Sequence, residues 1–289
     1  QPIEIWAKQA GMDWRIESSD VSYMANNDKG HNLILPFAEQ KVLYRSDNFE
    51  PLSVVSQRYQ EVQPREILEF YRDLTEQSDF ELETAGVLKG GRKLWALART
   101  GQSATLKGKD VSNGLLLATA CDGTLATTAQ FTSIRVVCNN TLAISLANGS
   151  GGMVKVPHST SFDAQKVKQQ LGVSVKQWEE HSYEMKQLSE RRVTQAEAAN
   201  YLSRVFNDQD NDIILFNSAK KENMFNGQGR GADLDAAKDT AYGLLCSITE
   251  YVDHERRAMN TDNRLNSAWF GAGAKLKQKG LEQSLLLLA

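Results

Sequence analysis

Two pairs of histidine and carboxylate side chains have the spacing needed to face one side of a helix and hold a metal. His181 and Glu184 lie one helical turn apart, as do Glu250 and His254. If the two helices were neighbours, these side chains could surround one ion. The Glu-x-x-His spacing of di-iron bundles is absent, however. Solvated or capping roles are the more ordinary interpretation, so no metal ligand is assigned and a metal-dependent enzyme remains an alternative.

Other catalytic patterns are missing from the sequence. There is no His-Glu-x-x-His, no paired Cys-x-x-Cys and no Gly-x-Ser-x-Gly. The glycine-rich stretch from Asn226 to Gly231 resembles a phosphate-binding loop, but it lacks the Gly-Lys-Ser/Thr ending and a strand running into it. A mobile linker is the better interpretation. We therefore expect no catalytic residue and no cofactor, and we do not expect an enzyme.

Positive charge is concentrated in one segment of an otherwise acidic chain. The net charge is −3, yet the segment from Ala85 to Phe162 holds eight basic and only two acidic residues. Such a segment is typical of a surface that binds a polyanion, although solvated strands can also use lysine and arginine. The candidate phosphate contacts are Lys89, Arg92, Lys93, Arg99, Lys107 and Lys109.

A helix is expected from Ser133 to Asn148, and its sequence is unusual. Asn139 and Asn140 are weak helix formers inside an apolar stretch, and Arg135 opposes the favoured sign of the helix dipole. These residues could form a polar network that docks the helix on a sheet, or they could contact a ligand. Arg135, Asn139 and Asn140 therefore join the nucleic-acid-binding candidates.

Two β-hairpins should position the basic residues. Strands Phe80–Leu88 and Lys93–Arg99 flank Lys89-Gly90-Gly91-Arg92, and strands Leu115–Cys121 and Thr124–Phe131 flank Asp122-Gly123, both turn-forming sequences. Shorter elements should precede them, namely a first helix after Pro2, strands near 14–17, 33–37, 41–45 and 52–56, and a helix opening at Pro64.

The second half of the chain reads as mainly helical. Helices are expected at 162–192 with a bend at Gly172, from a capping box at Thr194 to Phe206, at 235–256 and at 272–288. The predicted fold class is α+β, with a central antiparallel β-hairpin sheet packed by a helix (β-β-β-β-α). We expect residues 1–149 to form the sheet domain and residues 150–289 a helical region packing on it, separated at Ser150-Gly151-Gly152.

The cysteines and the apolar runs bear on the compartment. Cys121, Cys138 and Cys246 are an odd number at wide spacing among apolar neighbours, which favours buried thiols in a reducing compartment. No apolar run is long enough to span a bilayer, and no signal peptide is visible after Gln1. The sequence thus predicts a cytoplasmic protein without membrane contact.

Several stretches carry a resemblance to a known family. They are PIEIWAKQAGMDW (2–14), VVSQRYQEVQ (54–63), TAGVLKGGRKLWALAR (84–99), FTSIRVVCNNTL (131–142), TEYVD (249–253) and SAWFGAGAKLK (267–277). These stretches resemble the phage/plasmid-like proteins grouped as domain of unknown function 932. The resemblance implies a gene of a mobile element in bacteria or their viruses, and it implies no defined activity.

A second resemblance is architectural only. A β-hairpin sheet followed by a crossing helix is similar to the core of Rad52-type single-strand annealing proteins, which form oligomeric rings and bind DNA in a basic groove. The expected function is therefore binding of single-stranded DNA by a homo-oligomer, in DNA recombination or single-strand annealing. The alternatives are a metal-dependent enzyme acting on nucleic acid, and a non-enzymatic interaction protein acting on host defence.

Overall fold

The computed structural model describes residues 2–26, 32–77, 80–107, 109–135, 140–143, 153–171, 175–206, 225–226, 228–230 and 235–289. The chain divides into two compact units. The first comprises Gln1–Arg99, Leu115–Ala129 and Met153–Leu171, and the second comprises Thr100–Gly114, Gln130–Gly152 and Gly172–Ala289. The expected boundary at 149/150 lies outside the described residues, so that division of the chain stays a prediction.

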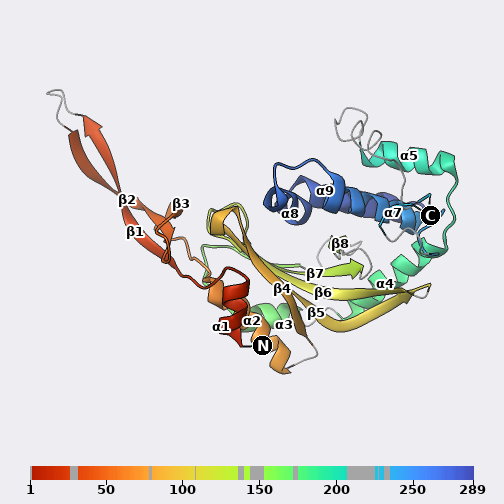
Figure 1. The fold of residues 1–289 in the computed structure, drawn as a ribbon, viewed down its shortest axis with the longest axis horizontal. Coiled ribbons are helices and arrows are strands. Elements are labelled where there is room, and N and C mark those ends of the chain that lie inside the picture. Colours follow the sequence, from red (N-terminus) through yellow and green to blue (C-terminus); the bar gives the residue numbers. More distant parts are fainter. Residues whose placement is uncertain are drawn as a thin grey trace. The chain divides into compact units, whose positions relative to one another are not determined.

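A three-stranded antiparallel sheet lies near the start of the first unit. Its strands are β1 (Ile16–Asn26), β2 (Asn32–Arg45) and β3 (Pro51–Ser56), in the order β1-β2-β3. The strands expected at 33–37 and 41–45 are one continuous strand. Only the part of β2 from Gln40 to Tyr44 pairs with β3, so β1 and β2 continue past β3 as a two-stranded ribbon (Figure 1).

Two amphipathic helices accompany these strands. They are α1 (Ile3–Gln9) and α2 (Pro64–Gln77), which pack against each other. Proline is well suited to the first helical position because its missing N–H would have no helical partner there, and Pro64 opens α2 as expected. The α2 residue Tyr71 is buried, and its hydroxyl lies 2.9 Å from the Ala96 carbonyl and 2.8 Å from the Leu115 carbonyl. This helix is therefore fixed to the second sheet by hydrogen bonding as well as by apolar packing.

The second sheet contains both predicted hairpins. Its strands are β4 (Glu81–Leu88), β5 (Lys93–Leu106), β6 (Lys109–Ala120), β7 (Thr127–Arg135) and β8 (Asn140–Ala143), in that order, with β9 (Met153–Val156) also pairing with β7. A single helical turn, η1 (Lys89–Gly91), joins β4 to β5. The α+β class and the antiparallel hairpin sheet are thus confirmed.

The helix expected from Ser133 to Asn148 is wrong where the structure describes it. Strand β7 continues to Arg135, and β8 pairs with it antiparallel, from Thr132 opposite Ala143 to Arg135 opposite Asn140. The β-branched residues here favour a strand, and asparagine is common in turns. Two helices from later in the chain, α7 (Ala241–Glu250) and α9 (Ala272–Leu285), pack against β8 instead.

The C-terminal half is mainly helical, as expected. The helices are α3 (Ala164–Leu171), α4 (Val175–Glu190), α5 (Gln195–Val205), α7 (Ala241–Glu250), the π-helical turn η2 (Tyr251–Glu255), α8 (Thr261–Phe270) and α9 (Ala272–Leu285). The capping box at Thr194 is confirmed. The helix expected from Asp235 begins only at Ala241, because Thr240 caps it by accepting a hydrogen bond from the Gly243 N–H.

Candidate nucleic-acid interface

Most of the predicted basic residues lie at the two ends of one strand, β5. Lys89, Arg92 and Lys93 lie at the turn that leads into β5, whereas Lys107 and Lys109 lie at the turn that follows it. The other candidates are spread along the sheet: Arg99 within β5, Arg135 at the end of β7 and Asn140 at the start of β8, while Asn139 lies outside the described residues. The turn before β5 therefore brings together three of the nine residues.

The first of these turns has an unusual backbone. Lys89, Gly90 and Gly91 all have positive φ, at 57°, 70° and 101°. Glycine adopts such angles without steric cost. Gly91 is also pressed against Trp14, since a Cβ added to Gly91 would lie 2.9 Å from the indole ring. The turn is thus fixed by its own glycines and by a tryptophan from near the N-terminus.

Arg45 connects this turn to the turn between β2 and β3. Its guanidinium lies 4.3 Å from the centre of the Trp14 ring, pairs with Asp47 at 2.7 Å and donates to the Gly90 carbonyl at 3.3 Å. The hydrogen bond from Arg45 holds the pKa of the Asp47 carboxyl below its ordinary value, and the same bond raises the pKa of Arg45. Since the positive charge of Arg45 is paired with Asp47, Arg45 acts mainly as a structural link.

An exposed aromatic residue lies in the turn that Arg45 holds. Phe49 is 74% exposed and has a φ of 60°, and its N–H donates to the Arg45 carbonyl at 3.0 Å. Positive φ is rare for a bulky residue and indicates strain or function. The sequence predicted strands near 41–45 and 52–56 on either side of Phe49 but did not single out this residue, whose only signal is a large apolar side chain between the two strands.

The turn between β6 and β7 packs beside the basic turn. The Cys121 N–H donates to the Arg92 carbonyl at 2.9 Å. Cys121 is buried, which raises the pKa of its thiol to about 12, so the thiol stays protonated and unreactive at neutral pH. The predicted burial of Cys121 and Cys246 is confirmed, and Cys138 lies outside the described residues.

The three basic residues of the turn differ in exposure. Arg92 is exposed and Lys89 is half-exposed, whereas Lys93 is only 8% exposed. Burial lowers the pKa of Lys93, and the nearby charge of Asp122 acts in the opposite direction. Farther along β5, Arg99 is half-exposed and forms an ion pair with Glu83. Lys89 and Arg92 are therefore the two side chains of this turn best placed to meet a phosphate.

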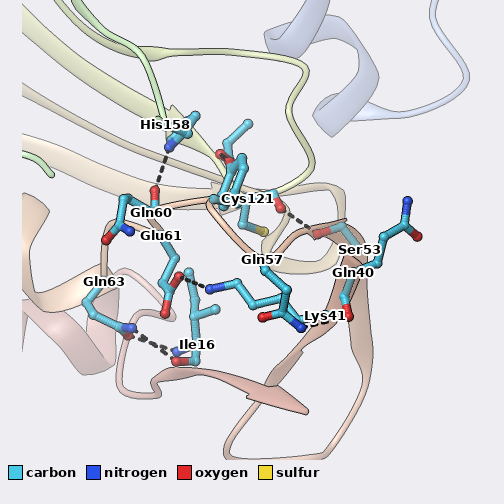
Figure 2. Close-up of polar contacts among 12 residues, drawn as sticks. Ile16, Gln40, Lys41, Ser53, Gln57, Gln60, Glu61, Gln63, Cys121 and His158 are labelled. Atoms are coloured by element: carbon cyan, nitrogen blue, oxygen red, sulfur yellow. Dashed lines mark hydrogen bonds and ion pairs between the residues drawn. The ribbon is translucent and has the colours of Figure 1, made fainter. Parts of the chain in front are cut away.

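Strand β3 and the segment that follows it bond to the β6–β7 turn and to His158, and Figure 2 draws the Ser53–Cys121 and Gln60–His158 contacts. Ser53 donates to the Cys121 carbonyl at 2.5 Å. The ring nitrogens of His158 lie 2.9 Å from the Gln60 carbonyl and 3.0 Å from the Leu125 carbonyl, and the His158 ring stacks on Tyr59 at 4.5 Å. These contacts give the turn a fixed support.

Polar residues of the VVSQRYQEVQ stretch form hydrogen bonds and an ion pair with the first sheet. Gln63 exchanges two hydrogen bonds with the backbone of Ile16, at 2.9 and 3.0 Å, and Glu61 pairs with Lys41 at 3.2 Å (Figure 2). Both contacts tie the segment after β3 to the first sheet. Their role is structural.

The two pairs of histidine and carboxylate residues that were considered as metal ligands lie in the second unit, in different surroundings. His181 is 1% exposed, neither ring nitrogen has a hydrogen-bond partner among the described residues, and burial lowers its pKa to about 4. The Glu250 carboxylate instead accepts from the Arg230 N–H at 3.0 Å. No three His, Cys, Asp or Glu side chains gather as a metal requires in the part of the chain that the structure describes. The metal-dependent alternative therefore gains no support from these residues.

The stretches TEYVD and SAWFGAGAKLK meet in the second unit. Lys277 and Asp253 form a buried ion pair at 2.8 Å, and Arg256 donates to the Ser267 hydroxyl at 2.9 Å. A Cβ added at Gly273 would lie 2.7 Å from a methyl group of Val252. Close packing of η2, α8 and α9 accounts for Val252 and Asp253 in the first stretch and for Gly273 and Lys277 in the second.

Comparisons with known proteins agree with the resemblance seen in the sequence. A family model described as Domain of unknown function (DUF932) matches residues 51–269. No curated protein and no solved structure matches the chain. The architectural likeness to Rad52-type proteins therefore stays a hypothesis. Among the described residues, no helix combines the length and apolar character that a membrane crossing requires.

Proposed function

The chain belongs to the DUF932 family, and from that premise we propose that it binds nucleic acid, in particular single-stranded DNA. Lys89 and Arg92 at the β4–β5 turn would be the principal phosphate contacts. The observation that carries the proposal is that Arg92 is exposed and Lys89 half-exposed at one turn, whose backbone is held by Trp14 and Arg45.

The physical basis is charge neutralisation at a rigid turn. A lysine or arginine that meets a phosphate releases condensed counterions, so binding weakens as salt increases. A preformed turn loses little conformational freedom on binding, which favours affinity. Lys107, which is exposed, stays a candidate for a further phosphate contact, as do Lys109, Arg135, Asn139 and Asn140.

A salt series tests the proposal. Binding of a fluorescent thymidine oligonucleotide, followed by anisotropy, should weaken with salt with a log–log slope of about −0.7 for each phosphate neutralised. The double substitution Lys89→Gln/Arg92→Gln should flatten that slope by about 1.4. Lys275→Gln/Arg204→Gln removes one lysine and one arginine that are exposed elsewhere and should leave the slope unchanged. Equal slopes in all three proteins, or no binding at low salt by folded wild-type protein, would contradict the proposal.

Self-association belongs to the same proposal. The outer ribbon, by which we mean residues 21–26 of β1 and 32–38 of β2, carries exposed apolar side chains and no charged residue. These side chains are Tyr23, Met24, Leu33, Ile34 and Phe37. Met24 and Ile34 lie on one face of the ribbon, and Tyr23, Leu33 and Phe37 lie on the other. Such uncharged apolar surface suits a second copy of the chain better than a polyanion. We accordingly propose a homo-oligomer acting in strand annealing or recombination in the cytoplasm of a bacterial or phage-infected cell.

A further inference from the structure

Phe49 is the feature that the proposed phosphate contacts leave unexplained. Its side chain is 74% exposed, so core packing does not account for it. Its φ of 60° is one that glycine or asparagine adopts far more readily than phenylalanine. An apolar ring kept in solvent on a disfavoured backbone points to a ligand contact.

The turn that carries Phe49 is well ordered by its own hydrogen bonds. The Phe49 N–H donates to the Arg45 carbonyl at 3.0 Å, and the Glu50 N–H donates to the Asn48 side chain at 3.0 Å. Arg45 pairs with Asp47 in this same turn. The backbone that presents the ring is thus fixed before any ligand arrives.

The same guanidinium places this turn beside the basic one. Besides pairing with Asp47, Arg45 donates to the Gly90 carbonyl, between Lys89 and Arg92. An exposed ring, the exposed Arg92 and the half-exposed Lys89 therefore lie on two turns that share one hydrogen-bonding residue. Single-stranded nucleic acid has the matching pattern, since each nucleotide joins a flat base to a phosphate.

We propose that Phe49 stacks on an unpaired base of a single strand whose phosphates lie on Lys89 and Arg92. This inference rests on the proposed function and adds to it the class of nucleic acid. Stacking needs an open base face, which a duplex does not offer within its length. It is also independent of sequence, because every base has such a face.

The test uses a substitution that removes the ring and suits the backbone. Glycine accepts the φ of residue 49, so Phe49→Gly should fold at least as stably as the wild type in a thermal melt. Its affinity for a thymidine oligonucleotide should fall about tenfold at fixed salt, as expected for the loss of one stacked base. The salt slope should not change, because no charge is removed. Phe49→Trp should keep the wild-type affinity, and Phe49→Leu, which is apolar but not aromatic, should lose it as Phe49→Gly does.

An abasic oligonucleotide supplies the matching change on the ligand. The wild type should bind this strand as weakly as Phe49→Gly binds the thymidine strand, and Phe49→Gly should bind both equally. The inference is overturned if Phe49→Gly binds the thymidine strand as the wild type does, or if it loses affinity for blunt duplex DNA by the same factor. If the wild type binds neither strand at low salt, the proposed function fails, and the stacking role fails with it.

Discussion

Gly90 and Gly91 are neighbours that differ in the room around them for a side chain. Both have positive φ, but a Cβ at Gly90 would meet nothing within 4 Å, whereas one at Gly91 would lie 2.9 Å from Trp14. Gly90→Ala should therefore lower the free energy of unfolding by about 1 kcal/mol, the cost of a left-handed alanine. Gly91→Ala should cost about 2–4 kcal/mol, because the tryptophan must move as well. Urea unfolding measures both, and equal losses would show that Trp14 does not constrain the turn.

His181 should make the stability of the protein depend on pH. Burial lowers its pKa from 6.5 to about 4, so the unfolded chain takes up a proton at a higher pH than the folded chain does. The folded protein gains stability from keeping His181 neutral. This contribution to the free energy of unfolding is complete above pH 6.5 and is lost as the pH falls towards 4, by roughly 3 kcal/mol in all.

A variant without the imidazole isolates this contribution. Burial raises the pKa of Glu184 on the same helix, which gives stability of the opposite pH dependence, lost as the pH rises. The difference between wild type and His181→Leu cancels the part due to Glu184. Between pH 7 and pH 4.5, urea unfolding should show a smaller loss of stability in His181→Leu than in the wild type. Parallel pH profiles would mean that the ring is hydrated in solution.

At the scale of elements, the sequence predicted the hairpins because their turns depend on a few neighbouring residues. Gly90, Gly91 and Gly123 have positive φ, which glycine adopts readily, so a glycine between two strand-like segments indicates a turn. The helix expected at Ser133–Asn148 was wrong over the residues that the structure describes, because an apolar stretch rich in β-branched residues suits a strand better than a helix. β7 pairs instead with β8, which lies close by in the chain, from Arg135 opposite Asn140 to Thr132 opposite Ala143, and the apolar character of the stretch does not distinguish such a strand pair from a helix.

The predicted start of α7 at residue 235 was wrong for a similar reason. Residues 235–240 have helical composition, but the helix begins after Thr240, and a Cβ at Gly243 would lie 1.8 Å from the Ala237 carbonyl oxygen. The chain before the helix thus crosses it closely at a glycine. Helical composition does not reveal such a crossing, although Thr240 is a residue type that commonly caps a helix.

In the ion pair between η2 and α9, loss of one partner should destabilise the protein more than loss of both. Lys277 and Asp253 have side chains only 5% and 8% exposed. Lys277→Met should lower the free energy of unfolding by about 3–5 kcal/mol, because it leaves a buried carboxylate without its cation. The double variant Lys277→Met/Asp253→Leu should recover most of that loss, since no buried charge remains. A double-mutant cycle by urea unfolding measures the coupling, and additive losses would refute it.

At the scale of the whole molecule, composition predicted the segregation of charge but not its placement. The basic segment does coincide with the second sheet, yet strand β5 puts Lys89 and Arg92 at one end and Lys107 at the other. A count of charges along the sequence does not show that these residues lie at opposite ends of a long strand. It also missed Phe49, whose significance lies in a backbone angle and in a hydrogen bond from Arg45 to Gly90.

The outer ribbon lies outside the residues matched by the family model, which begin at residue 51. A two-stranded ribbon with exposed apolar side chains is marginal in water by itself, and its unpaired edges invite another strand. Met24 and Ile34 are paired across it and are 66% and 75% exposed. We expect their apolar surface to be covered by a second copy of the chain.

Light scattering should therefore report a multiple of the 32.2 kDa chain mass for the wild type. Met24→Ser/Ile34→Thr removes apolar surface and keeps the β-branched shape at position 34, so the chain should stay folded while the measured mass falls towards that of one chain. Met259→Ser is the matched control, because Met259 is 94% exposed but lies in the second unit, and its mass should equal that of the wild type. A wild type that is monomeric at micromolar concentration would leave the ribbon to a different partner and would remove self-association from the proposed function. If all three proteins share one oligomeric mass, the copies associate through another surface.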